Sequence, residues 1–192
     1  MIDPLIGFVF FGLFSPGPNV ILLTTSGARF GFRPTLPHLG GVVLGVGITA
    51  GLTGLGLGAL LAAAPGLETG LRLAAACWIL FMAWQLWTAT PRDAQSTQSP
   101  MSLGEAVLFQ WVNPKVWAVA LAAASAYPGG LSPWGEALRL GGTFSGINLF
   151  VCLFWTSAGS LLSYLLQSPL AWTVFNRVMA VALGSYAGLL FH

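Results

Sequence analysis

The chain has 192 residues, of which 56% are hydrophobic and only 6% are charged, with a formal net charge of +2. Soluble domains carry roughly a quarter charged residues, so this composition excludes a water-soluble globule, and the small net charge gives no indication of a nucleic-acid partner. Apolar runs of about 20 residues recur along the chain, long enough to cross the hydrocarbon layer of a bilayer. We therefore predict an all-α, multi-pass membrane protein.

Six membrane-spanning helices are predicted in chain order, near residues 4–26, 38–63, 67–89, 103–126, 136–165 and 170–191. The connections are short and contain glycine or proline, which stop helices, and only segment 89–102 resembles a linker. We expect one transmembrane domain, with halves at approximately 1–95 and 100–192. No basic region typical of a cleaved signal peptide precedes the first apolar run, so we expect that run to be retained.

The arginines predict the orientation of these spans. Loops one, three and five share one side of the membrane and contain Arg29, Arg33 and Arg92, whereas the opposite side has Arg72 and Arg139. Cytoplasmic loops carry the excess of basic residues. The first side is therefore predicted to be cytoplasmic, with both termini outside.

The two halves are predicted to be an inverted repeat, because each has an odd number of spans and so enters the membrane in the opposite direction. The second span begins LGGVVLG at residue 39 and the fifth LGGTFSG at residue 140. The first and fourth spans each contain a polar interruption with proline, SPGPN at 15–19 and VNPK at 112–115. Paired interruptions in corresponding helices are the best sequence indication of a transporter's binding site. We predict two inverted three-helix repeats with helices 1 and 4 broken mid-span.

The prolines explain what the interruptions do. Pro16, Pro18 and Pro114 lack the amide proton, so each leaves a carbonyl one turn earlier without its helical partner, and in lipid such groups must be satisfied internally. Asn113 before Pro114 is typical of an N-cap before the first helical residue, and Ser15 before Pro16 gives the same pattern. The N-termini of the two half-helices are predicted to converge near the membrane midplane, where partial positive charge suits a carboxylate.

The predicted substrate-binding site combines these interruptions with Lys115, which lies about half way along the fourth span. A lysine there costs about 2.5–3.5 kcal/mol on insertion and normally faces a cavity or partner, although snorkelling to an interface is an alternative. A simple kink is the alternative for either interruption taken alone. The predicted site residues are Ser15, Pro16, Gly17, Pro18, Asn19, Asn113, Pro114 and Lys115.

Secondary candidates are Asn148, Trp111, Arg29 and Arg33. For Asn148 an interhelical hydrogen bond is the alternative to substrate contact. Trp111 lies beside the fourth-span interruption, where it is placed to shape a cavity. The two arginines are predicted topology determinants, with a cytoplasmic gate or substrate recruitment as the alternative role.

Other residues are expected to have structural roles. The glycines of the second span form faces of small residues that allow close helix packing, and Gly184 and Gly188 are compatible with packing or with a homodimer interface. His38 is expected at the membrane interface rather than in a proton relay. Cys77 and Cys152 are expected as isolated core residues. The spans contain no cluster of metal ligands and no catalytic constellation, so we expect no metal, no cofactor and no enzyme.

At these residues the chain resembles the LysE/RhtB family of amino-acid exporters. SPGPNVILLTTSGARFGFRPTLPHLGGVVLGVG is similar to the family's first span, arginine-bearing loop and second span, FQWVNPKVWAVALAA to its fourth, and FNRVMAVALGSYAGLLF to its last. The resemblance implies export of small amino acids or derivatives across the bacterial inner membrane, with segments 16–19 and 113–115 on the family's motif positions. Gly31, Phe32 and Arg33 are similar to the cysteine and O-acetylserine exporter branch.

One departure from the family concerns the coupling ion. Many members have an acidic residue near the position of Val46, whereas this chain has LGVGITAGLTG without a carboxylate. Lys115, a loop carboxylate and the substrate's own groups are the open alternatives for a proton carrier. An exporter of another small solute and a non-transporting accessory membrane subunit are the competing functions, and the expected partners are a small amino acid and the lipid bilayer.

Overall fold

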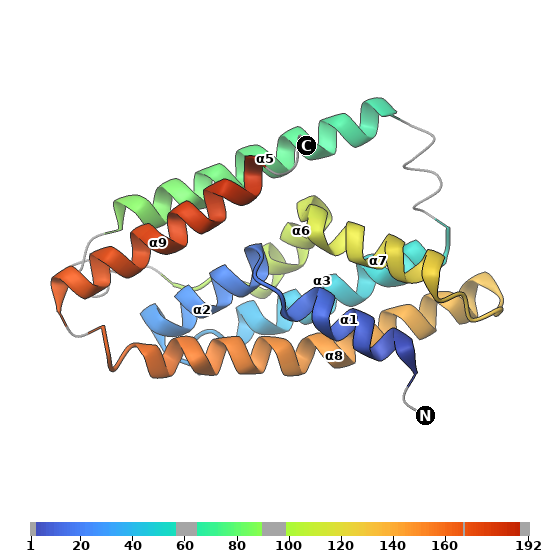
Figure 1. The fold of residues 1–192 in the computed structure, drawn as a ribbon, viewed down its shortest axis with the longest axis horizontal. Helices are drawn as coiled ribbons and strands as arrows, with labels where there is room; N and C mark the ends of the chain where they lie inside the picture. The colour runs from blue at the N-terminus through green and yellow to red at the C-terminus, as the bar shows by residue number, and fades with distance from the viewer. Residues whose placement is uncertain (1–2, 57–64, 90–98, 167, 189–192) are drawn as a thin grey trace.

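The computed structural model describes residues 3–56, 65–89, 99–166 and 168–188, and all regular structure in them is helical. This confirms the predicted all-α class. The helices are α1 (Pro4–Phe14), α2 (Pro18–Phe30), α3 (Leu36–Gly54), α5 (Pro65–Thr88), α6 (Leu103–Val112), α7 (Pro114–Ala126), α8 (Pro133–Leu162) and α9 (Pro169–Gly188) (Figure 1).

Up to four of the predicted spans are long and apolar enough to cross a membrane within the described ranges. Helices α3 and α8 qualify alone, and the pairs α1 with α2 and α6 with α7 qualify as bent spans. Helix α5 lies where the third span was predicted, and its stretch Ala76–Thr88 is a shorter apolar helix. Helix α9 lies where the sixth span was predicted but does not qualify over its described residues. The six-span arrangement therefore stays a prediction. Parts of the predicted second span (57–63), linker (90–98) and last span (189–191) lie outside the described residues.

Helices α3 and α8 lie side by side, and the two bent pairs pack around them. Helices α1 and α2 contact α8, while α6 and α7 contact α3. Helices α5 and α9 form an antiparallel pair along one side of this bundle and touch it through α6 and α2 (Figure 1). When the two halves are exchanged, the contact of α2 with α8 corresponds to that of α3 with α7, and the contact of α3 with α6 corresponds to that of α1 with α8. This pattern agrees with an inverted repeat, which itself stays a prediction.

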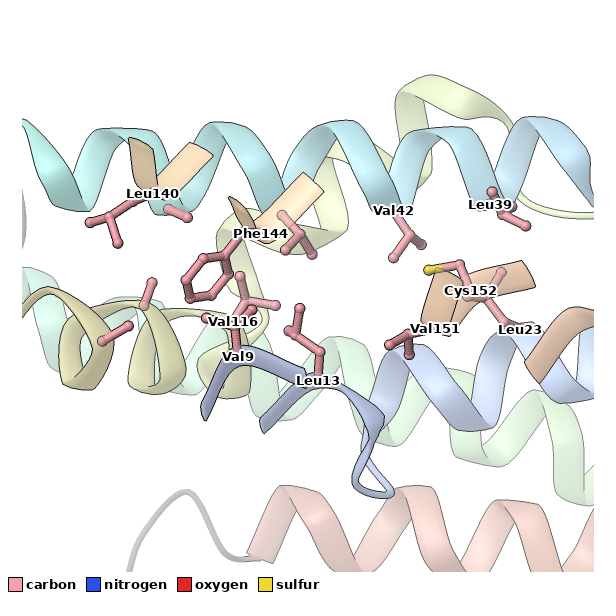
Figure 2. Close-up of a cluster of buried hydrophobic side chains, with 14 of the residues drawn as sticks. Val9, Leu13, Leu23, Leu39, Val42, Val116, Leu140, Phe144, Val151 and Cys152 are labelled. Atoms are coloured by element: carbon pink, nitrogen blue, oxygen red, sulfur yellow. The ribbon is translucent and has the colours of Figure 1, made fainter. Parts of the chain in front are cut away.

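A cluster of buried apolar side chains fills the space between the bent pairs and the two central helices. Figure 2 shows members of this cluster from α1, α2, α3, α7 and α8 meeting between the ribbons. Because lipid is as apolar as these side chains, close packing rather than the hydrophobic effect stabilises such a core. Cys152 belongs to the cluster, as predicted, whereas Cys77 is exposed, so the core prediction for Cys77 is wrong.

The glycines of α3 bring it against both neighbours, which confirms their predicted packing role. A Cβ atom added to Gly45 would lie 2.6 Å from Cγ of Gln110 in α6, and one added to Gly41 would lie 2.6 Å from Cβ of Ala106. On the other side, a Cβ on Gly54 would lie 2.8 Å from the backbone nitrogen of Ala137 in α8. A side chain at these positions would separate the helices.

The corresponding glycines of α8 are packed differently. Gly142 and Gly146 occupy the repeat positions of Gly41 and Gly45, yet a Cβ atom on either would meet no atom within 4 Å in the described part of the chain. The two halves therefore differ at this point, since the crossing of α3 with α6 is tight and the matching face of α8 is open.

Candidate functional site

The first interruption separates α1 from α2 with a bend of 59°. The hydroxyl of Ser15 donates a hydrogen bond to the carbonyl of Gly12 (3.0 Å), the group that Pro16 leaves without its helical partner. Helix α2 begins at Pro18 with Gly17 as its N-cap, so the prediction of Ser15 as the N-cap is wrong. The reason is that Ser15 caps the end of α1 instead. No side chain caps α2 among the described residues.

The second interruption separates α6 from α7 with a bend of 64°. The side-chain oxygen of Asn113 accepts a hydrogen bond from the backbone amide of Lys115 (3.2 Å), and α7 begins at Pro114. This confirms the predicted N-cap. The backbone amide of Asn113 donates to the carbonyl of Gln110 (3.3 Å), which Pro114 cannot pair.

Gln110 joins the two interruptions. Its side chain is fully buried, and its Oε1 accepts hydrogen bonds from Nδ2 of Asn19 (2.8 Å) and from Nδ2 of Asn113 (3.4 Å). Its Nε2 donates to the carbonyl of Ala106 (2.9 Å). Gln110 was not among the residues predicted from the sequence. The signal that could have found it is a glutamine inside an apolar span, one turn before the asparagine and proline of FQWVNPK.

Lys115 also connects the interruptions. Its Nζ donates to the backbone carbonyl of Ser15 and lies 3.5 Å from that of Pro16. Its side chain covers Gly17, where an added Cβ would lie 2.6 Å from Cδ of the lysine. These carbonyls end α1, and the partial negative charge of a helix C-terminus stabilises a cation. The ammonium thus faces a partner inside the protein, as predicted.

A small cavity, called here the central cavity, lies between the interruptions. Its polar lining comprises Gly17, Asn19, Asn113, Lys115 and Asn148, and the rest of the wall is apolar. The volume of about 10 Å³ is at the threshold for one water molecule, so the site is closed to anything larger in this conformation.

Three buried polar atoms around the central cavity are unpaired within the described ranges. They are Oδ1 of Asn19, Nδ2 of Asn148 and Nε1 of Trp155. Buried groups of this kind are normally hydrogen-bonded, and their accumulation at one place indicates a polar occupant. One acceptor and two donors, next to an ammonium group, suit a small molecule that carries both donors and acceptors.

The remaining predicted residues lie elsewhere. Ser15, Pro16, Pro18 and Pro114 shape the two turns but do not line the central cavity. Trp111 is exposed, and its carbonyl accepts a hydrogen bond from Nε1 of Trp117 (3.0 Å).

The two arginines and His38 lie at one end of the bundle. Arg33 is exposed in the loop after α2, and Arg29 is half-buried. His38 is only 2% exposed, so its side chain is buried within the protein, and its position at the level of the membrane interface stays a prediction. In the part of the chain that the structure describes, no group of three acidic, histidine or cysteine side chains could hold a metal ion.

Comparisons with known proteins agree with these features. The LysE type translocator family matches residues 10–192. A protein of Vibrio cholerae serotype O1, known as an uncharacterized membrane protein, is 28% identical over 176 residues, which cover 85% of this chain and 83% of that protein. No solved structure matches the chain significantly. The match over nearly the whole length, including both interruptions, shows that the chain belongs to the LysE type translocator family.

Proposed function

We propose that the protein is a secondary exporter of small neutral amino acids, or of derivatives similar to cysteine and O-acetylserine, across the bacterial inner membrane. Members of its family are transporters and not enzymes. The observation that carries the proposal is the meeting of two broken helices at one cavity, where Asn19, Asn113 and Lys115 converge. Broken helices that meet at the interface of two halves are typical of transporters that work by alternating access.

The contacts of Lys115 indicate how an amino acid binds. In the closed cavity the ammonium donates hydrogen bonds to the carbonyls of Ser15 and Pro16. A substrate carboxylate binds the Lys115 ammonium in place of these carbonyls. The carbonyls then accept hydrogen bonds from the substrate's own ammonium group. The uncapped amides at the start of α2 and the unpaired Oδ1 of Asn19 complete the set of partners. Substrate binding therefore replaces the contact between the lysine and the carbonyls by two contacts, one for each charged group of the amino acid. The cavity widens to admit the substrate when the two halves move.

Replacement of Lys115, the only lysine in the chain, tests this proposal. Lys115→Ala should lower transport at least about tenfold, because a hydrogen bond between charged groups contributes on the order of 1.5–3 kcal/mol. The measurement is uptake of a panel of radiolabelled neutral amino acids into everted membrane vesicles, with and without a pH gradient.

Arg177→Ala is the matched control, because Arg177 is another cation within a helix, stacks on Trp87 at 5.1 Å and lines neither cavity. The control should transport normally. Unchanged transport by Lys115→Ala, at equal protein level in the membrane, would contradict the proposed site. Absence of transport for every compound by the unmodified protein would favour an accessory subunit instead.

A further inference from the structure

A second and much larger cavity, called here the α5 cavity, lies between α2, the start of α3, α5 and the start of α6. Its volume is about 270 Å³, more than tenfold the space that one water needs. It shares no lining residue with the central cavity. The loop from α2 to α3 and the residues before α6 lie at the same end of the bundle (Figure 1). The arginines predict this end to be cytoplasmic, where an exported solute arrives.

One wall of the α5 cavity is mostly apolar. Helix α5 contributes Trp78, Phe81, Met82 and Leu86 together with one polar residue, Gln85, and Met101 before α6 also lines the cavity. Aromatic, thioether and aliphatic side chains of this kind bind an apolar group of variable shape. This wall contrasts with the polar groups of the central cavity.

The facing wall carries charged and polar groups of both signs. Arg29 provides a guanidinium, which stacks on the ring of Phe30 at 5.2 Å and suits a carboxylate. Glu105 provides a carboxylate, which is fixed by two hydrogen bonds of 2.8 Å from the amide and hydroxyl of Ser102 to its Oε2. Because both bonds use the same oxygen, Oε1 is the atom that a ligand would meet.

His38 indicates that this cavity has a polar occupant. Its imidazole is 2% exposed and lines the cavity, and neither ring nitrogen has a hydrogen-bond partner among the residues that the structure describes. A buried imidazole without partners loses stability unless something in the cavity pairs with it. The cavity therefore combines an anion-binding group, a cation-binding group, an unpaired buried ring and an apolar wall.

We propose that the α5 cavity is a second ligand site, which takes an amino acid with an apolar side chain before it reaches the central cavity. The ligand's carboxylate meets Arg29 and His38, its ammonium meets Glu105, and its side chain lies against Trp78 and Phe81. The inference rests on the proposed function for the ligand class, and goes beyond it by assigning a separate site that selects the side chain. The polar central cavity then binds the zwitterionic groups common to all amino acids.

Equilibrium binding of radiolabelled L-methionine to the protein in nanodiscs tests the second site. The Lys115→Ala variant, which removes the proposed central contact, should still bind methionine. Within that background Glu105→Gln and Arg29→Gln should each weaken binding about tenfold or more, because each loses one charge-assisted bond. Glu105→Gln is the safest variant for folding, since Glu105 is exposed and glutamine also completes a capping box.

Matched controls separate the site from general effects of charge. Glu136→Gln alters a half-buried carboxylate near the start of α8 that is paired with Arg139, and Arg177→Gln alters an arginine that also stacks on an aromatic ring. Neither residue lines the α5 cavity, so both variants should bind methionine normally. Methioninol, which lacks the carboxylate, should bind about tenfold more weakly. A change in tryptophan fluorescence on binding should be reduced in Trp78→Phe.

Several results would overturn the second site. Loss of all methionine binding in Lys115→Ala would show that only the central cavity binds. Binding that is insensitive to Glu105→Gln and Arg29→Gln, or equal affinity for methioninol, would contradict the zwitterion contacts. Tight lipid copurifying in the cavity and displaced by no amino acid would assign it to a lipid instead. Because these measurements need no transport, failure of export with intact methionine binding would count against the proposed function alone.

Discussion

At the scale of single residues, Gln110 positions the two interruptions beside the central cavity, because its amide group is hydrogen-bonded to an asparagine of each. Its partner Asn19 is 91 residues away in the chain. Sequence rules for caps and prolines use neighbouring residues, so they predicted Asn113 as an N-cap but not the pairing of Asn19 with Gln110. The same limit applies to the burial of His38, which depends on helices distant in sequence and was not predicted.

The Gln110 amide leads to a prediction about stability. Gln110→Leu should destabilise the protein by about 1 kcal/mol or more, because two buried asparagine amides then lose their acceptor. Gln85→Leu, at an exposed glutamine of α5, should leave stability unchanged within about 0.5 kcal/mol. Unfolding in mixed micelles with increasing dodecyl sulfate measures both variants.

A double-mutant cycle isolates the bond itself. Combining Asn19→Ala with Gln110→Ala should give a coupling free energy of about 0.6 and at most about 1.7 kcal/mol, the range measured for polar pairs between membrane helices. A coupling of zero would show that the 2.8 Å contact does not hold the interruptions together.

At the scale of helices, the sequence predicted where breaks occur better than where each new helix begins. SPGP contains two prolines that can each start a helix, and the hydrogen bond from Ser15 to Gly12 selects the second one. At the other break a single proline follows asparagine, so only one start was available. The third and sixth spans were predicted from apolar content, and in the part of the chain that the structure describes the stretch Ala76–Thr88 of α5 is a shorter apolar helix.

Adjacent glycines in α3 provide a matched test of helix packing. Gly41→Ala should destabilise the protein by about 1–3 kcal/mol, because its Cβ meets Ala106 and the backbone of Leu103. Gly40→Ala should be neutral or stabilising by up to about 1 kcal/mol, because its Cβ has only Leu103 Cδ1 at 3.9 Å and alanine favours helix. Thermal unfolding in nanodiscs compares the two. Equal destabilisation would contradict the close approach of α3 and α6.

At the scale of the whole molecule, the two halves have matching contacts but unequal packing. Gly41 and Gly45 pack tightly against α6, whereas a Cβ atom on Gly142 or Gly146 would meet no atom within 4 Å among the described residues. The repeat of glycines was visible in the sequence, but this difference was not, because it depends on which face of α8 turns toward its neighbours. If the halves exchange conformations during transport, the face of α8 that contains Gly142 and Gly146 would become closely packed, and the contact between α3 and α6 would loosen.

A cross-link between the halves tests whether they move. A Cβ atom on Gly12 of α1 would lie 3.7 Å from Cβ of Val119 in α7, within the range of about 3.5–4.5 Å that a disulfide needs. The variant Gly12→Cys with Val119→Cys, in a background with Cys77→Ser and Cys152→Ala, should form a disulfide under mild oxidation. Transport should then stop and return after reduction.

The two single-cysteine variants are the controls, and oxidation should leave their transport unchanged. Full transport by the oxidised double variant would show that α1 and α7 do not separate during the cycle. Failure to cross-link would place these helices further apart in the membrane than in the structure.

The contact between Lys115 and the carbonyls of Ser15 and Pro16 also has a consequence for biosynthesis. A chain is made from its N-terminus, so α1 and α2 are in the membrane before the segment with Lys115 leaves the ribosome. A lysine at mid-membrane costs about 2.5–3.5 kcal/mol when it enters without a partner. The carbonyls of Ser15 and Pro16, at the break in the first span, are already in the membrane when the fourth span inserts. The order of synthesis thus supplies the hydrogen-bond acceptors before the Lys115 ammonium enters.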